Sequence, residues 1–493
     1  MKLKQIIAEM GEADAVDLID RDISGIAYDS RRVTPGMIFV AIPGRNVDGH
    51  EYISRAINQG AAAVICENDA VPSTRADIIR VPNTRVALAR TAAAFYAHPS
   101  DQLEVVGVTG TNGKTTVSFM TKHILERAGK AAGLLGTVRY EIGERTIPAQ
   151  RTTPEALEIQ QMMRQMLRSG CSACVMEASS HGLEQNRVDQ VEFNVGVFTN
   201  LTAEHLDFHG SLESYFAAKR RLFESLRTGQ KAGVGVANID DAHGARLVRE
   251  MEGLSFVTYG RAAHADLRLE EVSVSAEGTS FGFVARGVTH VCRLPLIGRY
   301  NADNALAAIG AAMALGAPVA EAAEALATLP VVPGRLEPVE AGQDFKVYVD
   351  YAHTDDALAK ALETVREVTP GRVILLFGCG GDRDAGKRRR MGEVAARMSD
   401  LTVITSDNPR SEDPERIANE ILDGFAAVRT EGVSLELDRA RAIEETVWMA
   451  QPGDSVVIAG KGHETYQEFE NTVVPFDDRI HAREALERES HRM

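Results

Sequence analysis

A glycine-rich run with one lysine and several threonines is the part of the sequence best suited to chemistry. The run T-G-T-N-G-K-T-T spans residues 109–116 and follows the apolar residues 105–108. Glycines let backbone N–H groups turn towards phosphate oxygens, Lys114 can reach them as a point charge, and the Thr115 hydroxyl can bind Mg²⁺. We therefore predict a nucleotide-binding loop formed by Gly110, Thr111, Asn112, Gly113, Lys114, Thr115 and Thr116.

This loop departs from the commonest spacing of such motifs. In G-x-x-x-x-G-K-[ST] the first glycine would fall on Val108, whereas the glycines here are Gly107, Gly110 and Gly113. The alternative is a glycine-rich turn that only connects a strand to a helix. The intact T-G-T-N-G-K-T-T run after an apolar segment favours the nucleotide loop.

Polar residues also end two other apolar runs. Glu177 follows the run 173–176, and its carboxylate is a candidate Mg²⁺ ligand; the alternative is a cap for the next helix. The run 199–210 contains His205 and His209 together with two carboxylates. Such a cluster favours an active-site role, in which it holds metal or orients water, over a purely structural one.

Apolar, β-branched runs alternate with alanine-rich helical stretches, which is typical of an α/β protein with parallel sheets covered by helices. Ligands of such sheets bind beyond the carboxyl ends of the strands. Residues 264–294 alternate polar and apolar side chains and predict a small antiparallel excursion within the middle domain. The expected parallel strands are 105–109, 173–177, 193–201, 233–237, 346–351, 373–378, 401–406 and 455–459.

A chain of 493 residues is long enough for about three domains. A turn at residues 98–101 and a proline- and glycine-rich joint at 329–334 suggest the boundaries. The predicted domains are 1–98, 99–331 and 332–493. The first is a smaller α/β domain, the second carries the phosphate loop, and the third is Rossmann-like.

Composition excludes several classes of protein. A net charge of −16 and a pI of about 5.4 oppose nonspecific binding to nucleic acid. No apolar run is long enough to span a membrane, and the first residues lack a secretory apolar core. Cys171 and Cys174 form C-x-x-C, but without a second pair or a redox context we predict core residues. A cytoplasmic monomer that binds small molecules is expected.

Several motifs resemble those of the Mur ligase superfamily, whose members form amide bonds with ATP in peptidoglycan precursor synthesis. The motifs are T-G-T-N-G-K-T-T at 109–116, E-A-S-S-H-G-L at 177–183, T-N-L-T-x-E-H-L-D-F-H-G at 199–210, and Y-F-x-A-K at 215–219. Matches at Gly298, Asn301, Asn304, 333–335 and 349–354 extend the resemblance over nearly the whole chain.

The resemblance implies roles for single residues in nucleotide and metal binding. Lys114 and Thr115 would bind ATP and Mg²⁺, and Glu177 and His205 would also be metal ligands, with two Mg²⁺ ions expected. Lys219 would be carbamylated; without the family, a solvated basic helix face would be the preferred interpretation of its surroundings. Lys114, Lys219 and His205 are thus the candidate catalytic residues. The further nucleotide contacts implied are Asn301, Arg335 and Asp350.

The resemblance also implies two other substrates. A UDP-N-acetylmuramoyl-L-alanyl-D-glutamate would be held by Ser30, Thr152, Thr153, Ser179, Gln185 and Arg187. The run D-N-P-R at 407–410 is similar to that of members that add meso-diaminopimelate rather than lysine. An arginine can pair with the distal carboxylate of diaminopimelate, which lysine lacks. The residues implied for this amino acid are Arg383, Asp407, Asn408, Pro409, Arg410, Gly460 and Glu464.

The implied reaction is ATP-dependent ligation of diaminopimelate to the D-glutamyl γ-carboxylate through an acyl phosphate. A lysine-adding Mur ligase is the nearest alternative, and a folylpolyglutamate-type ligase is a more remote one. A P-loop nucleotide hydrolase would use no amino acid, and the guanine-binding N-K-x-D motif is absent from the sequence. A non-enzymatic scaffold would carry the same residues without activity.

Overall fold

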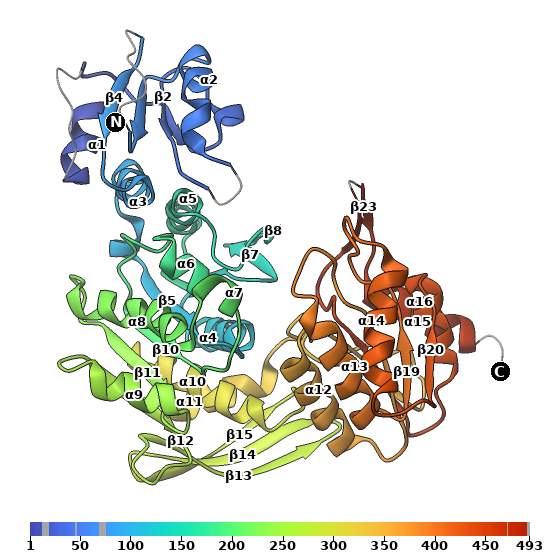
Figure 1. Cartoon of the computed structure of the whole chain (residues 1–493). Helices are drawn as coiled ribbons and strands as arrows, with labels where there is room; N and C mark the ends of the chain where they lie inside the picture. Colours follow the sequence, from blue (N-terminus) through green and yellow to red (C-terminus); the bar gives the residue numbers. More distant parts are fainter. Residues whose placement is uncertain (12–18, 45–46, 69–74, 471, 491–493) are drawn as a thin grey trace. The chain divides into compact units, whose positions relative to one another are not determined.

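The computed structural model describes residues 1–11, 19–44, 47–68, 75–470 and 472–490, and it confirms the predicted α/β class (Figure 1). The chain divides into two compact units. The first comprises Met1–Arg268 with Asn304–Ala322, and the second comprises Leu269–Asp303 with Ala323–Met493. Within the described ranges, no helix combines the length and the apolar character that crossing a membrane requires.

A small parallel sheet begins the first unit. Its elements are α1 (Leu3–Met10), β1 (Gly25–Ala27), η1 (Ser30–Arg32), β2 (Met37–Val40), η2 (Gly49–Tyr52), α2 (Ile53–Asn58), β3 (Ala63–Cys66), β4 (Asp77–Arg80) and α3 (Thr84–Phe95). The strand order is β1-β2-β3-β4. Because side chains alternate along a strand, Ile38 and Val40 pack with α1 and α3, whereas Phe39 packs with α2.

Most of a larger, eleven-stranded sheet follows in the same unit. Its elements are η3 (Pro99–Gln102), β5 (Glu104–Thr109), α4 (Lys114–Arg127), β6 (Ala132–Leu135), β7 (Arg139–Ile142), β8 (Arg145–Pro148), α5 (Ala156–Arg168), β9 (Ala173–Glu177), α6 (Ser180–Glu184), β10 (Val195–Phe198), α7 (Leu206–His209), α8 (Leu212–Thr228), β11 (Val234–Asn238), α9 (Ala242–Glu250) and β12 (Ser255–Gly260). Strand β5 lies between β10 and β9 and is parallel to both. The residues that follow β5 therefore emerge at the middle of the sheet's carboxyl edge.

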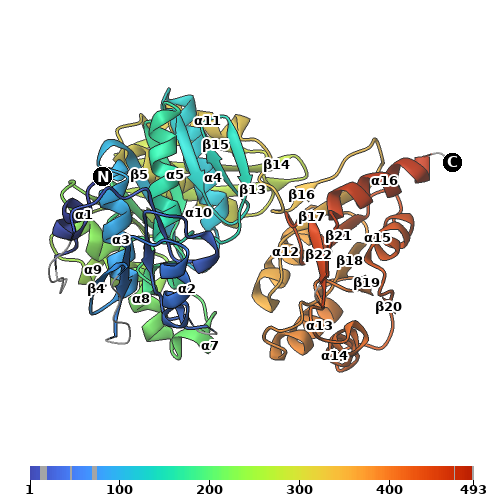
Figure 2. The same cartoon turned by 90° about the horizontal axis from the view of Figure 1, so that it is seen from above.

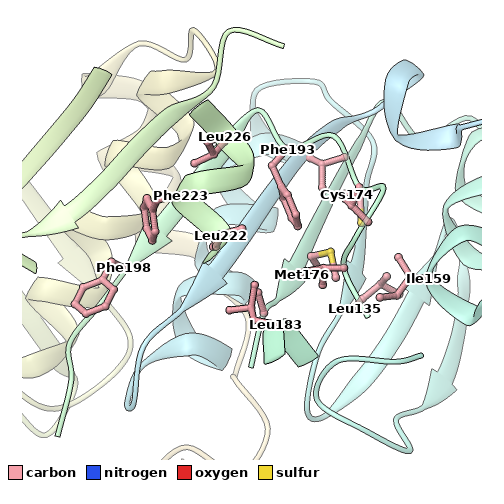
Figure 3. Packing of buried hydrophobic residues seen from close by; sticks show 14 of the residues in the cluster. Leu135, Ile159, Cys174, Met176, Leu183, Phe193, Phe198, Leu222, Phe223 and Leu226 are labelled. Atoms are coloured by element: carbon pink, nitrogen blue, oxygen red, sulfur yellow. The ribbon is translucent and has the colours of Figure 1, made fainter. Parts of the chain in front are cut away.

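Buried apolar side chains fix the position of β5 from one face of this sheet (Figure 3). A Cβ atom at Gly107 would lie 2.7 Å from the Phe193 ring and 3.0 Å from Leu222, so glycine allows α8 to pack closely against the strand. Cys171 and Cys174 belong to the same buried cluster, and burial raises the pKa of the Cys174 thiol. The prediction that both cysteines are core residues is thereby confirmed.

The chain passes between the units within β13, α10 and α11. The remaining elements are β13 (Leu267–Ser275), β14 (Gly278–Ala285), β15 (Val288–Leu294), α10 (Tyr300–Ala314), α11 (Val319–Ala325), η4 (Leu326–Thr328), β16 (Glu337–Pro338), β17 (Lys346–Asp350), α12 (Asp355–Val368), β18 (Val373–Phe377), α13 (Gly386–Met398), β19 (Leu401–Ile404), α14 (Pro414–Ala426), β20 (Val433–Leu435), α15 (Arg439–Trp448), β21 (Ser455–Ala459), β22 (Tyr466–Phe469), β23 (Thr472–Pro475) and α16 (Asp478–Ser490). The antiparallel pairing of β14 with β15 agrees with the excursion expected over 264–294, most of which belongs to the second unit.

The second unit contains a six-stranded sheet in the order β16-β17-β21-β18-β19-β20. Val373, Leu375 and Phe377 face a core shared with α12, α13 and α14, whereas Ile374 and Leu376 face one shared with α15 and α16. Figure 2 shows this sheet between its two groups of helices. The unit therefore has helices on both faces of a mostly parallel sheet, as predicted for a Rossmann-like domain.

Candidate active site

The predicted order of strand, loop and helix is present where β5 ends and α4 begins. Gly110 and Gly113 have φ values of 143° and 87°, which side chains rarely adopt. A Cβ atom at Gly110 would lie 1.9 Å from Thr199 Oγ1, and one at Gly113 would lie 2.4 Å from Asn304 Oδ1. Both positions therefore require glycine. Asn200 holds the loop by accepting from Thr111 N at 2.9 Å and from Asn112 N at 3.0 Å.

Two lysines meet at this loop. Lys114 Nζ donates to the carbonyl oxygens of Gly110 at 3.0 Å and Thr111 at 2.8 Å, and Lys219 Nζ donates to the same Gly110 oxygen at 2.7 Å. Lys219 comes from α8, is 1% exposed, and lies 4.4 Å from the centre of the Tyr215 ring. Its burial contradicts a solvated basic helix face. Burial, with a smaller contribution from Lys114, lowers the pKa of Lys219 well below its usual value, which favours the neutral, nucleophilic amine.

Replacing Lys219 with methionine is expected to raise stability while lowering kcat roughly 100-fold. The folded-state pKa of Lys219 lies below its usual 10.5, so folding below that pH requires release of a proton. The resulting destabilisation of the wild-type protein grows as pH falls from about 10 towards neutral. The increase in Tm of the variant over the wild type should therefore be larger at neutral pH than at about pH 10. Thermal unfolding in CO₂-free buffer at neutral pH and at about pH 10 measures this dependence. An equal change in Tm at both pH values would contradict it.

Glu177 ends β9 beside the base of the loop, because it is paired with Val108 of β5. Its carboxylate is 1% exposed and accepts from Thr137 N at 2.8 Å and Thr137 Oγ1 at 2.9 Å. The alternative role of helix cap is filled by Ser179, which accepts from Gly182 N at 3.1 Å. The carboxylate is therefore held at the sheet edge by a threonine.

Three histidines gather next to these residues. The ring centre of His181 lies 4.9 Å from that of His205 and 5.5 Å from that of His209, and Tyr215 packs against the last two. Burial, with His205 nearby, lowers the pKa of His181 to about 4, and partial desolvation also lowers the pKa of His205, whose side chain is 45% exposed. Neutral imidazole is the form that binds metal. The sequence motif contained His181 but assigned it no role.

Within the described ranges, no group of three or more His, Cys, Asp or Glu residues is placed to hold a metal ion. The donor set of a Thr115 hydroxyl, the Glu177 carboxylate and a neutral His205 is nevertheless chemically suitable for Mg²⁺, which prefers oxygen ligands and tolerates waters in its shell. These three residues remain candidate ligands.

Five of the six predicted UDP-dipeptide residues form one network with the end of β9. Thr153 Oγ1 donates to the Glu177 carbonyl at 2.7 Å and accepts from Ser179 N at 2.9 Å. Arg187 donates Nη1 to Thr153 O at 2.9 Å and Nη2 to Gln185 Oε1 at 2.6 Å. Thr152 joins through Thr137 Oγ1 at 3.1 Å. Ser30 is buried in η1 of the N-terminal sheet, outside this network.

The remaining nucleotide candidates lie in the second unit or where the chain enters it. Asp350 ends β17 and accepts from Leu336 N at 2.7 Å and Ala352 N at 2.8 Å; burial raises its pKa. The Arg335 guanidinium lies 5.3 Å from the centre of the Tyr351 ring. Asn301, in the first turn of α10, donates to Ile297 O at 2.8 Å.

The two runs predicted to bind diaminopimelate come together at the carboxyl ends of β19 and β21. Asn408 Nδ2 donates to Glu464 Oε2 at 2.9 Å. Gly460 has a φ of 108°, and a Cβ atom there would lie 2.7 Å from Asp407 Oδ2. The close approach of the two loops thus depends on glycine. Pro409 is buried between Asn408 and the arginine that follows it.

The Arg410 side chain is oriented by two acceptors. Its Nε donates to Glu468 Oε2 at 2.9 Å and its Nη1 to Gly381 O at 2.8 Å. The side chain is 19% exposed, so Arg410 is not simply an exposed arginine that follows an Asn-Pro turn. Arg383, in contrast, is exposed in the loop before α13.

Comparison with known proteins decides the family. Models of the Mur ligase family catalytic domain, middle domain and glutamate ligase domain match residues 22–96, 108–312 and 334–462. A UDP-N-acetylmuramoyl-L-alanyl-D-glutamate--2,6-diaminopimelate ligase of Syntrophomonas wolfei is 44% identical over 486 residues, which cover 99% of each chain. The chain belongs to the Mur ligase family. As a Mur ligase, it is an ATP-dependent ligase.

Another relative and two solved structures also resemble this Mur ligase over most of its length. A protein of the same name from Solibacter usitatus is 45% identical over 96% of this chain and 95% of its own. A solved structure of a 2,6-diaminopimelate ligase of this kind has a TM-score of 0.70, with 31% identity, and covers 100% of this chain and 99% of its own. A Mycobacterium tuberculosis folylpolyglutamate synthase complexed with ADP shares the fold at 16% identity, with a TM-score of 0.63 over 76% of this chain and 92% of its own.

Proposed function

We propose that the protein joins meso-2,6-diaminopimelate to the D-glutamyl γ-carboxylate of UDP-N-acetylmuramoyl-L-alanyl-D-glutamate in the cytoplasm. One observation carries the choice of amino acid: Arg410 is oriented by Glu468 and Gly381 beside the paired Asn408 and Glu464. A guanidinium next to a carboxylate suits the distal end of this amino acid, which bears one carboxylate and one ammonium. The relatives at 44% and 45% identity bear the name of that activity.

The reaction has two steps. The γ-phosphoryl group of ATP is transferred to an oxygen of the γ-carboxylate, which gives an acyl phosphate and ADP. The amine of the amino acid then attacks the acyl carbon, loses a proton, and expels phosphate as the amide forms. Lys114 offsets the repulsion between the anionic reactants, and the network around Thr153 holds the dipeptide next to Glu177.

Mg²⁺ would neutralise phosphate charge when bound, held by Thr115, Glu177 and His205. Lys219 lies beside the loop, and burial lowers its pKa, which favours the neutral amine, the form that reacts with CO₂ to give a carbamate. A carbamate there would convert a buried cation into an anion near the phosphate site. Mass spectrometry of the intact protein in bicarbonate buffer, compared with Lys219→Met, detects this modification.

Phosphate release from ATP with the UDP-dipeptide, scanning amino acids one at a time, tests the proposed function. We expect release only with diaminopimelate, together with formation of the tripeptide. Equal or better release with lysine would identify a lysine-adding ligase instead. Release without any amino acid would indicate a nucleotide hydrolase, and no release under any condition would indicate a scaffold.

A further inference from the structure

A buried ion pair fixes the two loops of the candidate diaminopimelate site relative to each other. Arg439, at the start of α15, donates Nε and Nη2 to the two carboxylate oxygens of Asp478 at 2.7 and 2.8 Å, and both side chains are 0% exposed. The same guanidinium donates to Ser406 O at 3.2 Å and to Ala459 O at 3.0 Å. These carbonyls directly precede Asp407 and Gly460, so hydrogen bonds from Arg439 fix the backbone at the start of both loops.

Lys461 connects the side chains of the same loops. It is 0% exposed, and its Nζ donates to Asn408 Oδ1 at 3.0 Å and to Glu464 Oε2 at 3.2 Å. The backbone N–H of Glu468 also donates to Asn408 Oδ1, at 3.1 Å. Because an ammonium group can only donate, Lys461 fixes the orientation of the Asn408 amide and thereby turns its Nδ2 towards Glu464.

We propose that Lys461 is a positioning residue for recognition of the distal end of the diamino acid. Being fully buried, it does not contact the ligand. With Asn408 it occupies Glu464 Oε2, which leaves Oε1 as the oxygen available to the ligand's distal ammonium. This inference rests on the proposed function and adds to it the group that orders the site before the ligand arrives.

Charge gives Lys461 a second effect on Glu464. Burial raises the pKa of Glu464, and Asp407 raises it further, whereas Lys461 is the largest influence that lowers it. Removing Lys461 would therefore allow Glu464 to take up a proton at higher pH, and a protonated Glu464 attracts an ammonium ion less. The charged and titratable groups around Glu464 are Lys461, Asp407, Tyr351, Tyr466 and Arg439.

Lys461→Met in the full-length protein tests the inference. We expect the KM for diaminopimelate to rise about 10- to 100-fold, which is the range for loss of hydrogen bonds to a charged group. The KM values for ATP and for the UDP-dipeptide should stay within about twofold, which is too small to represent a lost contact. The pH below which the diaminopimelate KM increases should shift upwards, a change that a purely structural role would not produce.

Lys360→Met is the matched control, because Lys360 lies in the same unit and its ion pair with Asp356 is exposed. If Lys461→Met does not fold, Lys461→Gln keeps a donor in place of the charge, and we expect the same pH shift. An unchanged diaminopimelate KM and pH profile in a folded variant would overturn the inference. If the wild-type enzyme did not use diaminopimelate at all, the proposed function would fail first, so the two failures are distinguishable.

Discussion

Replacing Lys114 with alanine is expected to lower kcat about 1,000-fold or more, the largest loss associated with one charge-stabilising group. Lys114 Nζ lies within 3.0 Å of two carbonyl oxygens of the loop, where we propose that its charge acts on phosphate oxygens. Its removal also acts on Lys219, because the neighbouring charge of Lys114 is one cause of that lysine's lowered pKa. A more basic Lys219 is less often neutral, which reduces its reactivity towards CO₂.

The fold should survive Lys114→Ala, because the loop conformation depends on other residues. Gly110 and Gly113 pack against Thr199 and Asn304, and Asn200 accepts from the loop N–H groups. Lys122→Ala on the same helix is the matched control, since Lys122 pairs with Glu126 and Glu141 away from the loop. Phosphate release and Tm are measured for both variants. A Lys114→Ala enzyme that extends the UDP-dipeptide at the wild-type rate would refute the acyl phosphate mechanism.

Local patterns in the sequence were sufficient to predict the fold class and the central parallel strands of the two larger sheets. The strands were found because short β-branched runs end in polar or glycine-rich residues, and all eight predicted strands are present. The longest, 193–201, was predicted too long: β10 ends at Phe198, because Thr199 and Asn200 turn to brace the phosphate loop. The predicted domain boundaries remain predictions, whereas the two compact units depend on contacts that no local pattern encodes.

The parts of the site that the sequence did not reveal depend on residues far apart in the chain. Arg439 pairs with Asp478, and Lys461 reaches Asn408 across 53 residues. Neither residue belongs to a spacing that predicts a ligand, and their contacts form only in the packed structure. The burial of Lys219 could not be predicted from the sequence either, because exposed charged residues lie on the same helix and give no sign of which lysine is buried. The signal that was available for Lys461 was its place between Gly460 and Glu464, two residues already assigned to the site.

Replacing Arg410 with lysine is expected to lower kcat/KM for diaminopimelate about 1,000-fold. Sites built to hydrogen-bond a substrate group discriminate by about 10⁴ to 10⁵ when that group is missing. The lysine side chain of the variant would retain only part of the interaction with the distal carboxylate. Arg410 uses Nε for Glu468 and Nη1 for Gly381 O, so its planar guanidinium can be oriented by the protein and still offer further N–H groups to a carboxylate. An ammonium group has three donors on one atom and cannot satisfy both sides with this geometry.

The specificity of this loss separates recognition from folding and from nucleotide chemistry. The KM for ATP should remain within about twofold if Arg410 acts in the proposed amino acid site and not in nucleotide binding. Arg416→Lys is the matched control, since Arg416 is 72% exposed and its ion pair is with Glu420 on the same helix. If Arg410 binds the distal carboxylate, the variant should lose much less kcat/KM with free lysine as the substrate than with diaminopimelate, because free lysine lacks that carboxylate. An equal loss for both amino acids would instead mean that Arg410 supports the loop through Glu468, and the assignment of its role would be wrong.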